Sequence, residues 1–379
     1  MSKSNWWRRV SAAVAMVGVS SVIAADYPET YRASVKDSGE VIVGQYATRQ
    51  FNNALGQVFA DRFIANVVTD AEVCPGLTSF VKAYGGFGSE GNQSRRAGYD
   101  LGNAGVLAGL GYQLGKELEL GGLVGYSYNN ATSFKKSGTA DFNGFIVDIT
   151  DFQDDLTDNV LRVGFYGNYK WNNLFVNTSP TVGVHFLSDE EHITVGYAAN
   201  SVDSSKISRY DTGFDFSWYN RVGYVFELPK GFYLTPSYSL AMTYLHTASA
   251  TGGEDTTDRY NLTYRNISGN ENNWSLLQTL DARLGKVFNL SDNFAILPEF
   301  IAGWEHEYID PKQTGAYVRG GTWDKYTAPI QGIAQDRAIL GVGLSTIIAK
   351  KYEVSARYDE RLWGDGHNSN FTVGLSVKF

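Results

Sequence analysis

Two polar stretches of the sequence combine residue types that could catalyse hydrolysis. Asp189-Glu-Glu-His192 places carboxylates beside an imidazole, and some proteases activate water with neighbouring Asp and His residues. Gly366-His-Asn-Ser-Asn370 offers the nucleophile and base of a phospholipase, but on a predicted tight hairpin and with no acidic residue to orient the imidazole. A solvated polar loop explains each stretch more simply. We therefore expect no enzymatic activity and no catalytic residue.

A run of aspartates could gather calcium, which prefers oxygen ligands. Its members are Asp148, Asp151, Asp154, Asp155 and Asp158. They lack the spacing of an EF-hand loop and its glycine. An acidic surface loop that anionic lipid headgroups repel, or that divalent cations bridge to those headgroups, explains the run as well. We predict no metal site and no cofactor.

The last nine residues indicate the kind of secondary structure that dominates this chain. Five apolar residues alternate there with small or polar ones: Phe371, Val373, Leu375, Val377 and Phe379. Successive side chains of a strand point to opposite faces, so this strand has one oily and one wet face. Lipid outside and water inside require that pattern, and within lipid every backbone group must be paired in a closed barrel. The pattern also resembles the C-terminal signal that bacterial outer-membrane assembly machinery reads.

The same alternation recurs along the chain from Phe80 onward. It predicts twelve strands: Phe80–Gly88, Gly102–Leu114, Leu118–Tyr128, Asn159–Trp171, Leu174–Leu187, Gly213–Leu228, Phe232–His246, Trp274–Phe288, Phe294–Tyr308, Arg337–Ile348, Tyr352–Leu362 and Phe371–Phe379. Three prolines fall inside them, Pro180, Pro236 and Pro298, and we expect these to mark β-bulges because proline cannot donate to a ladder.

The connections between the predicted strands alternate in length. Short polar turns fall near Lys116, Asn172, Lys230, Ser291 and Lys350. The long connections are Ser133–Asp158, Ser188–Thr212, Thr247–Asn273 and Glu307–Asp336, with shorter ones at Ser89–Asp100 and Trp363–Asn370. Transmembrane barrels have short turns on the periplasmic side and longer loops outside, whereas a soluble sandwich has no reason to sort its loops. The predicted fold is all-β, a twelve-stranded antiparallel transmembrane β-barrel over residues 79–379.

The N-terminal part of the chain is organised differently. Residues 1–25 have the basic, apolar and small-residue regions of a secretory signal peptide, and residues 26–40 read as a short disordered lead-in. Residues 41–78 are predicted to form a helix and a turn, because apolar residues recur there at spacings of three and four. A helix of about 28 residues would be roughly 42 Å long. It could thread the pore, pack outside the barrel or cap its periplasmic end. The residues predicted to characterise a pore helix are Phe51, Asn52, Asn53, Leu55, Phe59 and Phe63.

Composition narrows the function classes. The formal net charge is −8, and removal of the signal peptide makes it more negative, which argues against a nucleic-acid partner. The single cysteine, Cys74, cannot form an internal disulfide, and it is too far from the predicted cleavage site for a lipoprotein anchor. Beyond the N-terminus no apolar run is long enough for a membrane-spanning helix.

In the order and spacing of several short motifs, the chain resembles the autotransporter β-domain, the translocator of type V secretion. The resemblance is carried by Phe80–Gly88, Gly98–Gly105, Phe294–Gly303, Asp336–Leu344, Tyr352–Tyr358, Gly364–Gly366 and the terminal strand. It implies a twelve-stranded barrel in the bacterial outer membrane with an α-helix inside the pore. The implied partners are outer-membrane lipid and lipopolysaccharide, the outer-membrane assembly machinery and periplasmic chaperones.

The chain departs from the family in one respect. Members usually carry a long passenger before the barrel, whereas only Asp26–Glu40 stands here. We expect a translocator or pore without a large passenger of its own; the alternative is a surface adhesin that binds through its long loops. Some members cut their passenger at an Asn-Asn pair in the position of Asn52-Asn53. Such pairs recur here at residues 129–130, 172–173 and 272–273, so this one carries little weight.

Overall fold

The structure is a computed structural model that describes residues 33–34, 39–69, 75–90, 98–142, 145–197, 201–248, 251–252, 271–309, 312–319, 322–329, 335–364 and 366–379. The predicted signal peptide, most of the predicted lead-in and Cys74 lie outside the described residues.

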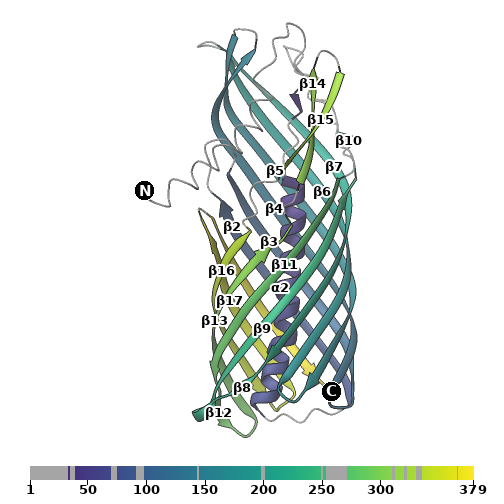
Figure 1. Ribbon diagram of the computed structural model, residues 1–379, viewed down its shortest axis with the longest axis vertical. Helices are drawn as coiled ribbons and strands as arrows, with labels where there is room; N and C mark the ends of the chain where they lie inside the picture. Colours follow the sequence, from purple (N-terminus) through teal and green to yellow (C-terminus); the bar gives the residue numbers. More distant parts are fainter. Residues whose placement is uncertain are drawn as a thin grey trace.

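Twelve long antiparallel strands form a closed barrel (Figure 1). They are β2 (Gly76–Glu90), β3 (Gly98–Leu114), β4 (Leu118–Phe142), β5 (Phe145–Trp171), β6 (Leu174–Tyr197), β7 (Ser201–Tyr224), β9 (Phe232–Thr247), β11 (Glu271–Lys286), β13 (Phe294–Glu307), β16 (Asp336–Ile348), β17 (Tyr352–Trp363) and β18 (Gly366–Lys378). Each pairs with the next, and β18 pairs with β2 from Gly366 opposite Glu90 to Lys378 opposite Thr78. The predicted fold class is confirmed.

Short elements flank the barrel at both ends. At the end with tight turns lie β8 (Phe226–Glu227), the 3-10 turn η1 (Pro229–Gly231) and β12 (Phe288–Ser291). At the other end lie β1 (Ala33–Ser34), β10 (Thr251–Gly252), β14 (Lys312–Arg319) and β15 (Thr322–Pro329). β14 pairs with β15, and β1 pairs with β14, so part of the predicted disordered lead-in forms a strand instead.

The long connections were predicted too long. The β4–β5 ladder continues through the predicted loop up to Phe142 opposite Phe145, and the β6–β7 ladder continues to Tyr197 opposite Ser201. An antiparallel ladder can extend beyond the barrel rim as long as the two backbones keep pairing, whether or not lipid surrounds them. The predicted hairpin at Trp363–Asn370 is also mostly strand, because β18 already begins at Gly366.

The three strand prolines do not mark bulges. Pro180 lies in a gap of the β5–β6 ladder, and the register is the same on both sides of that gap. Pro236 pairs with Ala282 of β11 and lies just beyond the end of the β7–β9 ladder. Pro298 pairs with Leu344 of β16 and lies just beyond the end of the β11–β13 ladder. Each proline therefore stands where its missing N–H removes no ladder bond.

The two faces of the wall differ in polarity. Val163 of β5 is 59% exposed on the outside, beside Val124 and Val182 of the neighbouring strands, which are also exposed. The adjacent Arg162 points inward and is 3% exposed. Apolar outside and charged inside is the arrangement of a barrel that crosses lipid. In the predicted assembly signal, Phe371, Val373 and Leu375 are exposed on the outer face, Val377 is half-buried, and the terminal Phe379 is exposed at the barrel rim.

A single long helix, α2 (Gly39–Val68), lies inside the barrel along its axis (Figure 1). It begins two residues before the predicted Val41. Phe51, Leu55 and Phe59 pack in one buried cluster with wall residues such as Phe80 and Tyr166, and Phe63 packs with Phe175 and Tyr233. The helix is therefore neither packed outside the barrel nor a cap at one end.

The mean hydropathy of α2 is too low for a helix that crosses a membrane. Within the part of the chain that the structure describes, no helix is both long and apolar enough to cross a membrane.

The lipid-facing band makes a testable prediction about stability. Val163→Arg, inside the exposed apolar row of β5 that runs from Leu161 to Trp171, should lower the free energy of unfolding by about 2–4 kcal/mol, because a cation deep in the bilayer loses its hydration. Trp171→Arg, at the end of the same strand, should cost only about 0–1 kcal/mol. The measurement is urea unfolding of protein refolded into lipid vesicles. Equal losses for the two variants would contradict a membrane-embedded β5.

Candidate functional site: the helix-filled lumen

The polar residues of α2 are buried together with its apolar ones. Five of them are at most 7% exposed: Gln45, Gln50, Asn52, Gln57 and Asp61. A helix on a protein surface leaves its polar side to water, whereas a helix enclosed by a barrel meets wall on every side. Each polar side chain therefore needs a partner in the wall.

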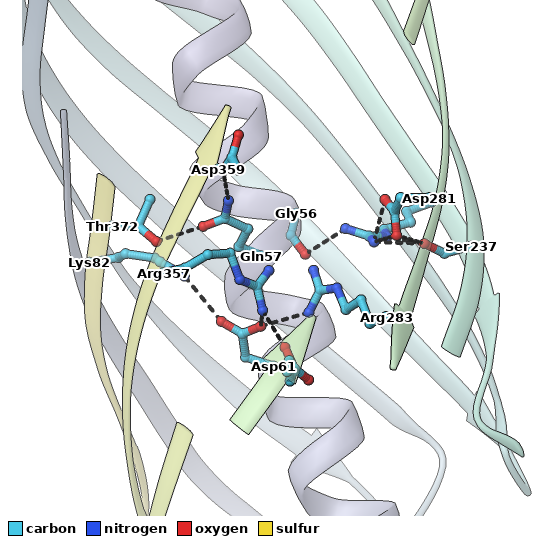
Figure 2. A network of polar contacts seen from close by, with 12 residues as sticks. Gly56, Gln57, Asp61, Lys82, Ser237, Asp281, Arg283, Arg357, Asp359 and Thr372 are labelled. Atoms are coloured by element: carbon cyan, nitrogen blue, oxygen red, sulfur yellow. Dashed lines mark hydrogen bonds and ion pairs between the residues drawn. The ribbon is translucent and has the colours of Figure 1, made fainter. Parts of the chain in front are cut away.

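Asp61 is the centre of the largest ionic contact between helix and wall. Its carboxylate lies 2.7 Å from Arg357 Nη2, 2.8 Å from Arg283 Nη1 and 3.2 Å from Lys82 Nζ (Figure 2). These three cations come from β17, β11 and β2, and all four side chains are at most 4% exposed. Arg357 also binds Glu299 of β13 at 2.8 Å. One helical carboxylate thus connects three separate strands.

Gln57 and Gly56 fix the turn of helix just before Asp61. Gln57 Nε2 donates to Asp359 at 3.2 Å, and its Oε1 accepts from Thr372 Oγ1 at 2.7 Å (Figure 2). On the other side Arg221 donates to the carbonyl oxygen of Gly56 at 3.3 Å. These contacts set both the depth and the rotation of the helix.

Two further ion pairs hold α2, one in its N-terminal half and one directly after Asp61. Arg49 Nη2 lies 2.6 Å from Glu307 Oε2, and Arg62 Nη2 lies 3.0 Å from Glu119 Oε1. All four side chains are at most 10% exposed. Ion pairs therefore bind the helix to the wall at two levels, one at Arg49 and one at Asp61 and Arg62, with apolar packing between them.

Glycines allow the helix and the wall to approach closely. A Cβ at Gly56 would overlap the phenol of Tyr219 in β7. A Cβ at Gly125 in β4 would overlap the ring of Phe51. Because each glycine makes room for an aromatic ring of the opposite element, helix and wall interlock in one register.

The wall contains its own buried chain of charges beside α2. His185 lies 2.8 Å from Asp158 and 2.6 Å from Asp215, and Asp215 also binds Arg162 at 2.5 Å. Arg162 Nη2 donates to Thr48 of the helix at 3.1 Å. Asp158, predicted to lie in an acidic surface loop, is instead a fully buried lumen residue, because the ladders to β4 and β6 continue past it.

The other aspartates that were considered as calcium ligands do not share a site with Asp158. Asp155 accepts from Thr132 at 2.9 Å, and the side chains of Asp148, Asp151 and Asp154 lie outside the described residues. Among the described residues no three His, Cys, Asp or Glu side chains gather in a way that could hold a metal ion.

The two polar stretches that were weighed as hydrolytic sites both lie on strands rather than in loops. In β18, His367 Nδ1 is 3.2 Å from Ser89 Oγ, whereas Ser369 Oγ donates to Glu360 at 2.6 Å, so the His and Ser have different partners. Asp189–His192 lies in β6, opposite β5 and β7. The side chains of Asp189, Glu191 and His192 lie outside the described residues.

The Asn52-Asn53 pair sits within the lumen. Asn52 is 4% exposed, and its Nδ2 donates to Ser217 Oγ of β7 at 2.8 Å. Asn53 is half-buried. The predicted pore-helix residues therefore lie in the lumen. The sequence analysis did not identify Gln57, Asp61 and Arg62, which also contact the wall. The available signal was a charged pair, Asp61-Arg62, placed between the apolar residues Phe59 and Phe63.

A lipid-facing barrel with a helix bound in its lumen defines the class, an outer-membrane translocator barrel. The family model described as "Autotransporter beta-domain" matches residues 79–359, and the chain belongs to this family. The protein is therefore an autotransporter translocator domain of the bacterial outer membrane. No curated protein sequence matches it significantly.

Two solved structures have a similar fold. The translocator domain of the autotransporter NalP from Neisseria meningitidis is 12% identical, with a TM-score of 0.57, over 88% of this chain and 98% of that one. The β domain of the Bordetella autotransporter BrkA is 17% identical, with a TM-score of 0.51, over 80% of this chain and all of that one. The comparisons give no specific support to the surface-adhesin alternative.

Neutralising the central carboxylate tests the ionic contact. Asp61→Asn keeps the shape of the side chain but leaves Lys82, Arg283 and Arg357 around a neutral amide. We expect the free energy of unfolding to fall by about 3–5 kcal/mol, because buried cations then lack their counter-charge. The same substitution at the exposed turn residue Asp292 should change it by less than about 0.5 kcal/mol. Similar effects at both positions would show that Asp61 does not anchor the helix.

The Asn52 contact predicts an intact chain. An Asn residue cleaves the chain when its side-chain Nδ2 attacks the backbone carbonyl carbon of the same residue. In this structure Nδ2 of Asn52 instead donates a hydrogen bond to Ser217. Mass spectrometry of protein purified from outer membranes should give one polypeptide that runs unbroken through Asn52-Asn53. A fragment that begins at Asn53, and that disappears in Asn52→Ala, would refute this expectation.

Proposed function

We propose that α2 is a resident plug, and that this translocator rests in a closed state with the helix bound in its pore. The observation that carries the proposal is the set of buried ion pairs from α2 to the wall, above all Asp61 with Lys82, Arg283 and Arg357. Withdrawing the helix would leave three wall cations close together, with water in place of the Asp61 carboxylate, so the helix-bound state is the stable one.

The direction of the helix supports its role as the end of a translocated polypeptide. Its N-terminus lies toward the end of the barrel with the extended hairpins, and its C-terminus leads toward β2 at the end with tight turns (Figure 1). Tight turns face the periplasm in outer-membrane barrels. A chain in this orientation has its N-terminal side outside the cell, as the product of outward translocation must.

The remaining partners belong to the same proposal. The outer face of the barrel would contact outer-membrane lipid and lipopolysaccharide. The outer-membrane assembly machinery would read Phe371, Val373, Leu375, Val377 and Phe379, and periplasmic chaperones would hold the chain before it folds. The proposed role is not enzymatic, and it requires neither a cofactor nor nucleic acid.

Conductance measures the plug directly. The mature protein in a planar bilayer should conduct weakly, and a variant lacking residues 26–70 should conduct far better, because ions then cross the open lumen. A variant that lacks only residues 27–38 keeps α2 and should behave like the intact chain.

The intermediate case is Asp61→Asn, which keeps the helix but loosens its anchor. This variant should open intermittently. No rise in conductance on removal of residues 26–70 would mean that the helix does not close the pore.

A further inference from the structure

A hollow lies at the periplasmic mouth of the barrel, beside the C-terminal part of α2. Its volume is about 330 Å3, within the range of roughly 300–1,000 Å3 that is typical of ligand pockets. Two turns border it, at Lys116-Glu117 between β3 and β4 and at Lys350-Lys351 between β16 and β17. The hollow is therefore reached from the periplasmic side, and it is separate from the Asp61 contact.

The rim of the hollow is cationic. Six basic residues line it: Arg62, Lys116, Lys170, Lys350, Lys351 and Lys378. Only Glu117 and Glu119 oppose them among its described side chains, and Glu119 is already bound by Arg62. For Lys116, Lys170, Lys350 and Lys351, the described part of the chain supplies no ion pair. Such a concentration of one charge attracts anions.

One buried guanidinium donor beside the hollow lacks a partner within the described part of the chain, as do donors of Arg49, Arg283, Arg337 and Arg357 elsewhere in the lumen. Arg62 is 6% exposed, and only its Nη2 binds Glu119; its Nη1 is buried with no hydrogen-bond partner among the described residues. Buried guanidinium donors are normally satisfied, because an unpaired one keeps its full desolvation cost. An acceptor oxygen in the hollow would satisfy it.

The floor of the hollow is aromatic. Phe59, Phe63 and Phe175 border it but are at most 7% exposed, and Lys170 Nζ lies 5.7 Å from the centre of the Phe63 ring. The terminal Phe379 also lines the hollow and is 69% exposed, so its ring is the one open to a ligand. A small inorganic anion would use only the cations, whereas a polypeptide segment with both acidic and apolar side chains would use the cations and the rings.

We propose that this hollow is a receptor for an acidic, aromatic-containing segment of an extended polypeptide on the periplasmic side. The inference rests on the translocator function and adds to it the charge class of the chain that the mouth accepts. Cations from two turns and two strands surround the mouth, so a passing chain meets the same attraction from several sides. Basic segments would be repelled.

Binding of labelled peptides to the full mature chain in uncharged detergent tests the proposal. A short peptide of alternating Asp and Phe should bind, and its Asn-Phe and Lys-Phe counterparts should not. Binding should weaken steeply as ionic strength rises from about 0.01 to 0.5 M, because the contacts are between partly exposed charges.

Matched lysine substitutions locate the site. The double variant Lys170→Gln with Lys351→Gln should weaken binding of the Asp-Phe peptide by about fivefold or more. Lys230→Gln with Lys286→Gln removes two lysines at the same end of the barrel but outside the hollow, and should leave binding unchanged. Heat-modifiable mobility on a gel would verify that every variant is folded.

Three outcomes would overturn the proposal. The first is equal binding of all three peptides, and the second is an equal loss in both lysine pairs. The third is binding of the Asp-Phe peptide that appears only when Asp70 and Glu72 are replaced by Asn and Gln. That result would mean that the chain's own acidic residues occupy the hollow. A failure here would leave the plug untouched, because the rise in conductance on removal of residues 26–70 does not depend on these lysines.

Discussion

The contact between Asp61 and the three cations Lys82, Arg283 and Arg357 is the interaction on which the arrangement of helix and barrel depends. The wall of a membrane barrel must be polar inside, and twelve strands enclose a lumen wide enough for one helix. Filling that lumen with a helix removes water from the charged wall residues. Water can then no longer stabilise those charges, so the helix must carry opposite charges at matching heights.

Apolar packing and ion pairing have different roles in holding α2. Phe51, Leu55 and Phe59 bury area against aromatic residues of the wall, which favours any deep position of the helix. The ion pairs at Arg49, Asp61 and Arg62 distinguish one depth and rotation from the others, since a shift by one turn would separate each pair. Packing thus supplies much of the attraction, and charge supplies the register. Gly56 and Gly125 reinforce that register by sterics.

The charges of the deep lumen and those of the periplasmic mouth differ in how fully they are paired. Within it, Asp158, His185, Asp215 and Arg162 already pair with one another, which leaves only part of the wall charge for the helix to neutralise. At the periplasmic mouth the turn residues Lys116, Lys350 and Lys351 have no ion pair among the described residues. The deep lumen is a site for one particular helix, whereas the mouth has the features of a less selective surface.

The sequence by itself determined the barrel, its strand order and the membrane face, because strand alternation is a local property that needs no knowledge of the partner strand. It also determined that residues near 41–68 form a helix, since the spacing of Phe51, Leu55 and Phe59 is equally local. Only the tertiary structure decided that this helix lies in the lumen, that Asp158 is a buried wall residue, and that the predicted loops at 133–158 and 188–212 continue as paired strands. Those outcomes depend on which side chains and backbones meet across long separations in the chain. Asp61 and Arg357 are such a pair, and nothing near either residue in the sequence specifies the other.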